Sequence, residues 1–140
     1  MIIIKMDDAL MLDHLVIKSI DRRGNVRELT TRLIRFYNHL RKSLRFACDD
    51  EYGYLSVNPA LLGSGLRVSM VASLPRLANN YTKLKSLCDS YDMIVLRQRQ
   101  CLFELCTGRQ SPGLSQFRLI VHFFNGVREI LEYEYSLRHQ

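Results

Sequence analysis

The side chains best suited to chemistry in this chain are its cysteines and histidines. Cys48, Cys88, Cys101 and Cys106 form no C-x-x-C pair, and no histidine stands beside any of them. Zinc sites need closely spaced pairs of such ligands, so we predict no metal site. We expect buried free thiols instead, which are typical of proteins in a reducing compartment.

The histidines form no catalytic or metal-binding pattern either. His14 directly follows Asp13 and precedes a segment with strand character, so we expect a structural hydrogen-bonding role for it. His39, His122 and His139 have no metal-ligand spacing with one another.

A third feature is the stretch GYLSVNPALLGSGLRVSMV, residues 53–71. It has the composition of an active-site loop that leads into a strand, yet it contains no histidine, cysteine or carboxylate. Acid–base or nucleophilic catalysis requires such groups. The stretch therefore favours a binding or structural role over a catalytic one.

The elements around this loop predict an α+β fold. Their order is strand, helix, loop, strand, helix, two strands and helix, without repeats or a linker. We expect strands at 15–22, 66–74, 93–100 and 101–106, and helices from Val26, after Pro75 and from near Ser115. Helices over one face of a mainly antiparallel sheet satisfy this order. We expect residues 1–140 to form a single domain.

Each predicted helix has an apolar stripe that should face the core. Asn25 is the expected cap of the first helix, and Leu114 and Leu119 are spaced for a hydrophobic staple on the last. The predicted buried residues are Val26, Leu29, Leu33, Phe36, Tyr37, Leu40 and Leu44; Leu77, Tyr81, Leu84, Cys88 and Tyr91; and Ile120, Phe123, Phe124, Val127, Ile130, Leu131 and Tyr135.

The composition is that of a basic globular protein with a net charge of +6 and 47% hydrophobic residues. Such a charge suits RNA, an anionic membrane face or an acidic protein, or it is a basic surface without a dedicated partner. RNA is supported by charge alone, because no stacking aromatics alternate with the arginines of the first helix. The opening MIIIKMDDALML is too short to span a bilayer and lacks a signal-peptide pattern, so we expect neither a membrane span nor a secretory signal.

Three stretches resemble the phosphagen kinases, the ATP:guanido phosphotransferase family. They are DHLVIKSIDRRGNVRELTTRL at 13–33, GYLSVNPALLGSGLRVSMVASLPRL at 53–77 and GLSQFRLIVHFFNGVREILEYEYSL at 113–137. The sequence around LRFACDDEYGYL, residues 44–55, most resembles that of the bacterial protein arginine kinases. The resemblance implies the last part of a glutamine-synthetase-like guanido-kinase catalytic domain, in truncated form.

The resemblance also implies that most catalytic groups are replaced. Phosphoryl transfer to a guanidinium needs a carboxylate base, cationic clamps on the phosphates and a closing loop. The family's paired glutamates, arginine, cysteine, asparagine and strand histidine fall on Met11 and Leu12, Val16, Asn58, Leu61 and Val71 respectively. Most of the acidic mobile loop is absent, because RQRQ at 97–100 runs directly into CLFEL. The small helical domain and the upstream arginines of the family have no counterpart among these 140 residues.

Some family positions are retained. Arg67 and Arg97 fall where the family keeps phosphate-binding arginines, so they are candidates for weak anion binding or for ordinary surface contacts. Gly63 and Gly65, with Asn58, mark what is left of the loop, and the glycines also suit a simple turn.

We therefore expect a noncatalytic pseudoenzyme, without catalytic residues or cofactor, that acts as a structural or interaction subunit of a larger protein assembly. The family's sheet has more strands than this chain supplies, so an apolar face or an unpaired edge should need a partner. MIIIK at the start could pair along such an edge. Alternatives are a regulatory domain that binds phosphoarginine, a nucleotide or another anion through Arg67 and Arg97, and a guanidino kinase completed in trans by another chain. We expect an intracellular, reducing location, in the cytoplasm or on the mitochondrial matrix side.

Overall fold

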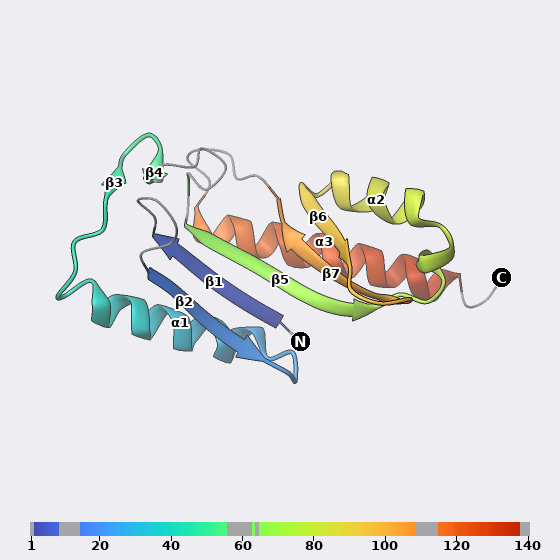
Figure 1. Cartoon of the computed structure of the whole chain (residues 1–140), viewed down its shortest axis with the longest axis horizontal. Coiled ribbons are helices and arrows are strands. Elements are labelled where there is room, and N and C mark those ends of the chain that lie inside the picture. The colour runs from blue at the N-terminus through green and yellow to red at the C-terminus, as the bar shows by residue number, and fades with distance from the viewer. Residues whose placement is uncertain (1, 9–14, 56–62, 64, 109–114, 138–140) are drawn as a thin grey trace. The chain divides into compact units, whose positions relative to one another are not determined.

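The computed structural model describes residues 2–8, 15–55, 63, 65–108 and 115–137 (Figure 1). The chain forms two compact units. The first comprises residues 1–68 with 109–116, and the second comprises 69–108 with 117–140. Each is described by itself.

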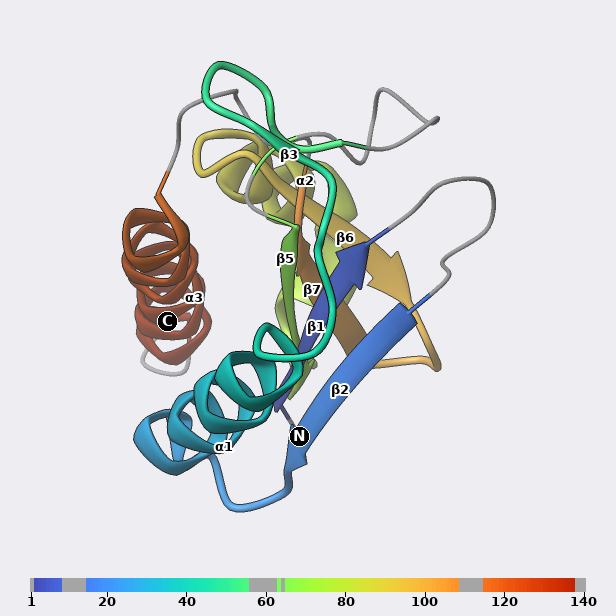
Figure 2. The same cartoon turned by 90° about the vertical axis from the view of Figure 1, so that its left-hand side faces the viewer.

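The first unit is built on an antiparallel strand pair and one helix. Strand β1 (Ile2–Asp8) pairs with β2 (Leu15–Asp21) along its whole length, with Ile2 opposite Asp21. The helix α1 (Val26–Leu40) packs against β2, as Figure 2 shows. The short strands β3 (Cys48–Asp49) and β4 (Gly53–Tyr54) form a separate antiparallel pair.

Buried and exposed side chains alternate along β2, and the buried ones contact α1. Ile17 and Ser19 are buried, whereas Lys18 and Ile20 are exposed. The Ser19 hydroxyl donates to the Leu29 carbonyl oxygen of α1 at 3.2 Å. Because successive strand residues point to opposite faces, α1 covers one face of this strand pair.

The start of α1 agrees with the sequence, but its buried stripe is shorter than expected. The Asn25 side chain accepts a hydrogen bond from the Glu28 backbone N–H, so the predicted cap is confirmed. Leu29, Leu33 and Tyr37 are buried as predicted. The prediction was wrong for Phe36 and Leu44, which are 52% and 46% exposed. Leu44 lies beyond the end of the helix, and Phe36 lines the open groove described below.

The second unit contains an antiparallel sheet with helices on one side. Strand β5 (Leu66–Ser73), which begins in the first unit, pairs from Ser69 onward with β7 (Leu102–Thr107), and β7 pairs with β6 (Met93–Arg97). The 3-10 helix η2 (Leu77–Asn79) and the helix α2 (Tyr81–Asp89) connect β5 to β6. The helix α3 (Gln116–Ser136) follows β7 and belongs to this unit from Phe117.

The register places the core of the second unit on one face of its sheet. Val95 opposes Leu105, and both are buried. Met93 on the same face lies against α3, where a Cβ on Gly126 would come within 2.9 Å of the Met93 Cε. Helices on one face of an antiparallel sheet are thus present within each unit, and the predicted α+β class is confirmed.

Several boundaries in the second unit differ from the sequence-based expectation. The α-helix expected after Pro75 begins only at Tyr81, because the 3-10 helix η2 comes first and Asn80 caps α2 by accepting from the Lys83 N–H. Tyr81 and Tyr135 were expected to be buried but are 41% and 63% exposed. The proposed Leu114 staple lies outside the described residues.

Candidate functional site

The predicted loop residues are only partly within the described structure. Asn58 lies outside it, as do the positions Met11, Leu12 and Leu61. Gly63 and Gly65 are buried and have φ values of 125° and 65°, which favour glycine. The Gly63 carbonyl oxygen accepts from the Tyr54 N–H at 2.8 Å, which joins Gly63 to β4.

The two candidate anion-binding arginines lie in different units. Arg67 belongs to the part of β5 in the first unit and is half-buried. Arg97 ends β6 in the second unit, where its Nη2 donates to the Ala78 carbonyl oxygen at 3.1 Å. Its guanidinium also lies 5.7 Å from the Tyr81 ring centroid and 5.2 Å from that of Phe103. These contacts give Arg97 a structural role in joining η2 and α2 to the sheet.

Val71, where the resemblance places the family's strand histidine, lies on the sheet face away from α2 and α3. Val71 opposes Glu104, which in turn opposes Leu96. In the neighbouring row Ser69 opposes Cys106, which opposes Ile94. We call this surface the open face; its apolar members are Val71, Ile94, Leu96, Leu102 and Cys106.

The open face is apolar and accessible. Ile94 and Leu96 are each 48% exposed, and both side chains project from β6, the edge strand of the sheet. Glu104 is its carboxylate, and it accepts a hydrogen bond from the Gln98 amide at 2.7 Å. Aliphatic side chains offer no charge to an anionic phosphoryl group, whereas they can be buried favourably against another apolar surface.

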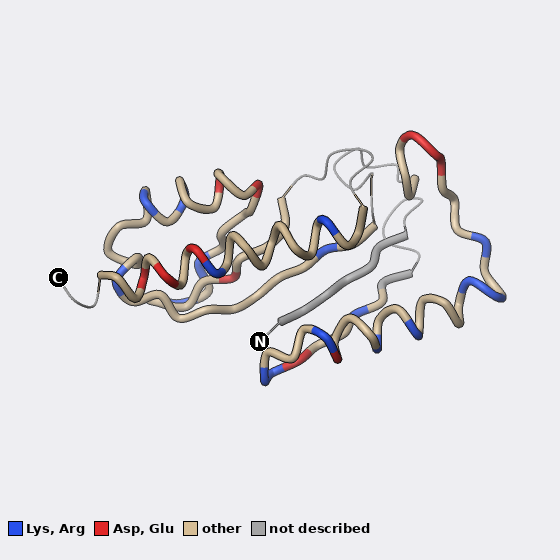
Figure 3. Tube along the Cα trace, turned by 180° about the vertical axis from the view of Figure 1, so that it is seen from behind, with Lys and Arg blue, Asp and Glu red and all other residues tan. Residues whose placement is uncertain are grey.

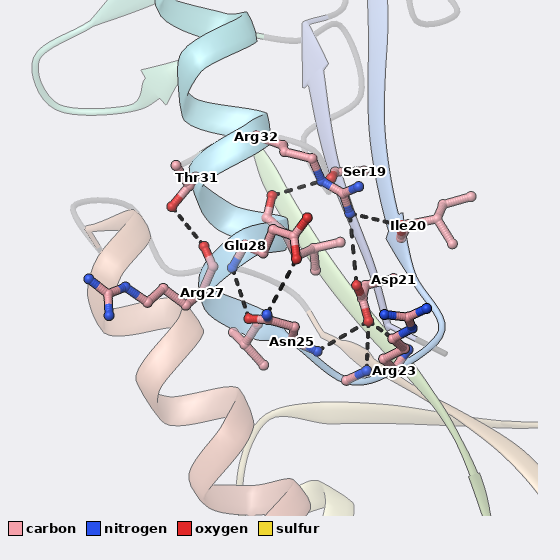
Figure 4. Close-up of polar contacts among 12 residues, drawn as sticks. Ser19, Ile20, Asp21, Arg23, Asn25, Arg27, Glu28, Thr31 and Arg32 are labelled. Carbon is pink, nitrogen blue, oxygen red and sulfur yellow. Dashed lines mark hydrogen bonds and ion pairs between the residues drawn. The ribbon is translucent and has the colours of Figure 1, made fainter.

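A second accessible surface lies in the first unit, between β2 and α1. It is an open groove of about 430 Å³ lined by residues 17–20 of β2 and by Arg32, Leu33 and Phe36 of α1. Figure 4 shows Arg32 reaching from α1 to β2, where its Nη2 donates to the Ile20 carbonyl oxygen at 3.1 Å. We call it the β2–α1 groove.

Asp21 at the end of β2 fixes the turn into α1. Its Oδ1 accepts from the backbone N–H groups of Asn25, Arg23 and Gly24 at 3.1, 2.7 and 2.7 Å (Figure 4). These bonds, that from Asn25 foremost, lower the pKa of the Asp21 carboxyl, with a smaller contribution from the Arg32 charge. The Asp21 carboxylate therefore has a structural role in holding the turn between β2 and α1.

An aromatic cluster follows α1 in the same unit. The Tyr37 and Phe46 rings stack with centroids 5.5 Å apart, and Tyr54 meets both edge-on. Arg41 lies 5.6 Å from the Tyr37 centroid, and with Arg45 it lines a pocket of about 380 Å³ beside the cluster. Figure 3 shows the basic residues spaced along α1 and the segment after it. Those basic residues are Arg27, Arg32, Arg35, Arg41, Lys42 and Arg45, and all are exposed.

The cysteines agree with the sequence-based expectation only in part. Cys88 is fully buried, and this burial, with a smaller effect from Asp89, raises the pKa of its thiol to about 11. Cys48 is exposed, contrary to the prediction, because it lies in the short β3 strand rather than under a helix. Cys101 and Cys106 are half-buried.

In the part of the chain that the structure describes, no three His, Cys, Asp or Glu side chains gather so as to hold a metal ion. Within the same ranges, no helix combines the length and apolarity that a membrane crossing requires.

Sequence reasoning missed one buried charge. Glu134 of α3 is 4% exposed and accepts from the Arg76 and Leu77 N–H groups, both at 2.9 Å. The signal was present, because the apolar stripe through Phe123, Val127 and Ile130 continues at the position of Glu134.

Comparison with known proteins identifies the family. The protein-family model described as ATP:guanido phosphotransferase, C-terminal catalytic domain, matches residues 10–137 of this chain. Arginine kinase 1 of Drosophila melanogaster is 30% identical over 131 residues, which cover 89% of this chain and 37% of the relative. Taurocyamine kinase of Schistosoma mansoni is 29% identical over 134 residues, covering 89% of the chain and 18% of the relative. The similarity to bacterial protein arginine kinases stays a prediction, since the relatives named here come from animals.

Solved structures agree with this assignment. The substrate-free duplicated taurocyamine kinase of Schistosoma mansoni superposes with a TM-score of 0.79 at 28% identity, covering 89% of this chain and 17% of that one. A lombricine kinase, at 19% identity, shares the fold with a TM-score of 0.78 over 91% of this chain and 38% of its own. The chain thus spans little more than a third, at most, of these relatives. It belongs to the ATP:guanido phosphotransferase family and corresponds to its C-terminal catalytic domain.

Proposed function

We propose that this chain is a noncatalytic phosphagen-kinase-like domain that works as an interaction subunit of a larger protein assembly. The observation that carries the proposal is the open face. At the family's histidine position it has Val71, and around that position it presents exposed Ile94 and Leu96.

The residue types at the other family positions support the loss of catalysis. Met11 and Leu12 stand where the resemblance places the paired glutamates, and neither can accept a proton or hold a guanidinium. Removing a single transition-state contact commonly lowers the rate about a hundredfold or more. Such effects do not simply add, but several replacements together should leave no useful turnover.

The open face supports the interaction role. Exposed branched aliphatic side chains on a sheet face gain free energy when a partner covers them. The anion-binding alternative is disfavoured by the contacts of Arg97, whose guanidinium is engaged by the Ala78 carbonyl and two aromatic rings.

Affinity purification from the source organism tests the interaction role. The tagged chain should retain a defined partner, and the double variant Ile94→Glu/Leu96→Glu should lose it. Lys85→Glu, which adds a negative charge on an exposed position of α2, is the matched control and should retain the partner. A soluble monomer with no co-purifying protein, or a partner that the double variant retains, would contradict the proposal.

A further inference from the structure

The pocket beside the aromatic cluster of the first unit combines aromatic rings with positive charge. It measures about 380 Å³, and its lining includes Tyr37, Arg41, Arg45, Phe46 and Tyr54. We call it the aromatic pocket. All of its lining residues lie between Tyr37 and Tyr54, so one continuous segment of the first unit builds it. Its volume is within the range of protein pockets that bind small organic groups.

Two half-buried rings form the aromatic part of the pocket. Phe46 stacks on Tyr37, which is only 9% exposed, and Tyr54 meets both rings edge-on. These contacts hold the rings in place, while Phe46 and Tyr54 keep part of their surface accessible in the pocket. A ring that is already fixed can stack on a planar ligand with little loss of conformational entropy.

The two arginines of the pocket are available to an anion. Both are exposed, and neither guanidinium forms an ion pair within the residues that the structure describes. Arg41 lies 5.6 Å from the Tyr37 ring centroid, and this contact leaves its N–H groups without a printed acceptor among those residues. Guanidinium groups bind phosphate well, because their planar N–H groups match two phosphate oxygens. The aromatic pocket therefore offers ring surface next to two phosphate-binding groups.

Positive charge continues from the pocket along α1. Residues 26–48 include six arginines and lysines but only one carboxylate, that of Glu28. Arg32 is engaged by the Ile20 carbonyl and Asp21, whereas Arg35 and Lys42 are exposed and form no ion pair in the described part of the chain. Figure 3 shows basic residues along α1 and the segment after it. Such a surface attracts a polyanion.

Acidic residues on the other side of the pocket limit where a polyanion can run. Asp49, Asp50 and Glu51 follow the pocket segment at the turn between β3 and β4. The Asp49 Oδ1 accepts from the Glu51 and Tyr52 N–H groups at 2.8 and 3.0 Å, which holds this turn. Its carboxylates repel phosphates, so a bound polyanion runs from the pocket toward α1.

We propose that the aromatic pocket binds single-stranded nucleic acid. One base stacks on the accessible surface of Phe46 and Tyr54, and the phosphates beside it contact Arg41 and Arg45. The strand then continues past Lys42 and along α1. This site lies in the first unit and uses no residue of the open face, so it stands independently of the proposed protein-interaction role.

Other anionic partners use fewer of these groups. An acidic protein segment pairs with the cations through carboxylates that cannot stack on the rings, and a duplex keeps its bases stacked inside. The sequence alone supported RNA by charge only, because Phe46 and Tyr54 do not alternate with the arginines of the helix. The fold brings both rings beside Arg41 and Arg45.

Fluorescence anisotropy tests the proposal with the purified full chain and a labelled oligouridylate of about twelve nucleotides. Four phosphate contacts should give a slope of about −3 when log K is plotted against log salt concentration. Arg41→Gln/Arg45→Gln should weaken binding about tenfold or more and reduce the slope to about −1.5. Lys85→Gln/Arg99→Gln removes the same charge from exposed positions of the second unit and should keep both affinity and slope.

Phe46→Leu separates stacking from charge. Leucine keeps an apolar side chain against Tyr37 but cannot stack on a base, so affinity should fall at least about fivefold while the salt slope stays unchanged. An oligothymidylate DNA is measured in parallel. Binding of either strand supports the proposal, and the ratio of the two affinities shows which is the better ligand.

Photocrosslinking locates the site without any variant. An oligonucleotide that contains thiouridine should form adducts on Phe46 or Tyr54 of the unmodified chain, identified by mass spectrometry of the digested protein. This readout remains decisive if Phe46→Leu fails to fold.

Four results would overturn the proposal. The first is no binding of either strand, and the second is equally tight binding of a polyglutamate of matched length. The third is crosslinking confined to the second unit. The fourth is a stability loss in Arg41→Gln/Arg45→Gln with unchanged oligonucleotide affinity, which would assign these cations to the C-terminal end of α1 and its helix dipole.

Discussion

Glu134 offers the sharpest test of how the second unit is held together. Its carboxylate lies under η2, where it accepts from the Arg76 and Leu77 N–H groups at 2.9 Å each. The Arg76 guanidinium lies 3.5 Å from the Glu134 Oε1, with the side chains of Arg76 and Glu134 38% and 6% exposed. We predict that replacing Glu134 with Ala greatly destabilises the chain.

The magnitude follows from the groups left without partners. A hydrogen bond to a charged group contributes about 1.5–3 kcal/mol, so loss of two such bonds should cost about 3–5 kcal/mol. Glu134→Gln keeps a single carbonyl acceptor and should cost about half as much. Arg76→Ala keeps both backbone bonds and removes a partly exposed ion pair, so it should cost less than about 1 kcal/mol.

Urea unfolding followed by far-ultraviolet circular dichroism measures these differences in a chain that lacks tryptophan. The expected order of destabilisation is Glu134→Ala, then Glu134→Gln, then Arg76→Ala. Glu132→Ala is the matched control on the same helix, because the Glu132 side chain is 72% exposed. A free energy of unfolding for Glu134→Ala within about 1 kcal/mol of wild type would refute the assigned role of this carboxylate.

Three further predictions concern packing, thiol reactivity and pH. Gly126→Ala should lower the unfolding free energy by about 1–3 kcal/mol, measured by the same urea titration, because its Cβ would lie 2.7 Å from a ring carbon of Tyr91. At pH 8 iodoacetamide should modify Cys48 rapidly and leave Cys88 unmodified until the chain unfolds, since Cys88 is buried and its pKa is about 11; mass spectrometry of digested protein checks this. The lowered pKa of Asp21 stabilises the fold above the ordinary carboxyl pKa, and this contribution is lost as the pH falls through the lower folded value. Asp21→Asn should therefore melt at a lower temperature than wild type at pH 7, and the difference should shrink in acid.

Local signals in the sequence predicted much of the fold. The alternation of β2 and the cap at Asn25 depend on neighbouring residues only, and both agree with the structure. The α1 stripe was extended too far because periodicity does not show where a helix ends. The chain turns after Leu40, and Phe46 then folds back to stack on Tyr37.

The roles of the candidate site residues were harder to predict, because each role depends on a partner that is distant in sequence. The resemblance predicted Arg97 as a phosphate-binding residue, yet its observed partner is the Ala78 carbonyl in the 3-10 helix η2, which no sequence pattern predicted. Phe36 fitted the apolar stripe, but it faces the open groove beside β2 rather than the core. Glu134 lay on a stripe treated as apolar, and its burial is explained only by the two N–H groups of η2.

The most direct test of the central claim is a phosphotransfer assay on the purified chain with ATP, Mg²⁺ and arginine, followed by phosphorus NMR. A full-length arginine kinase serves as the positive control. We expect no phosphoarginine above the enzyme-free background. Sustained phosphoarginine formation by the chain alone, abolished by Arg67→Ala, would contradict it.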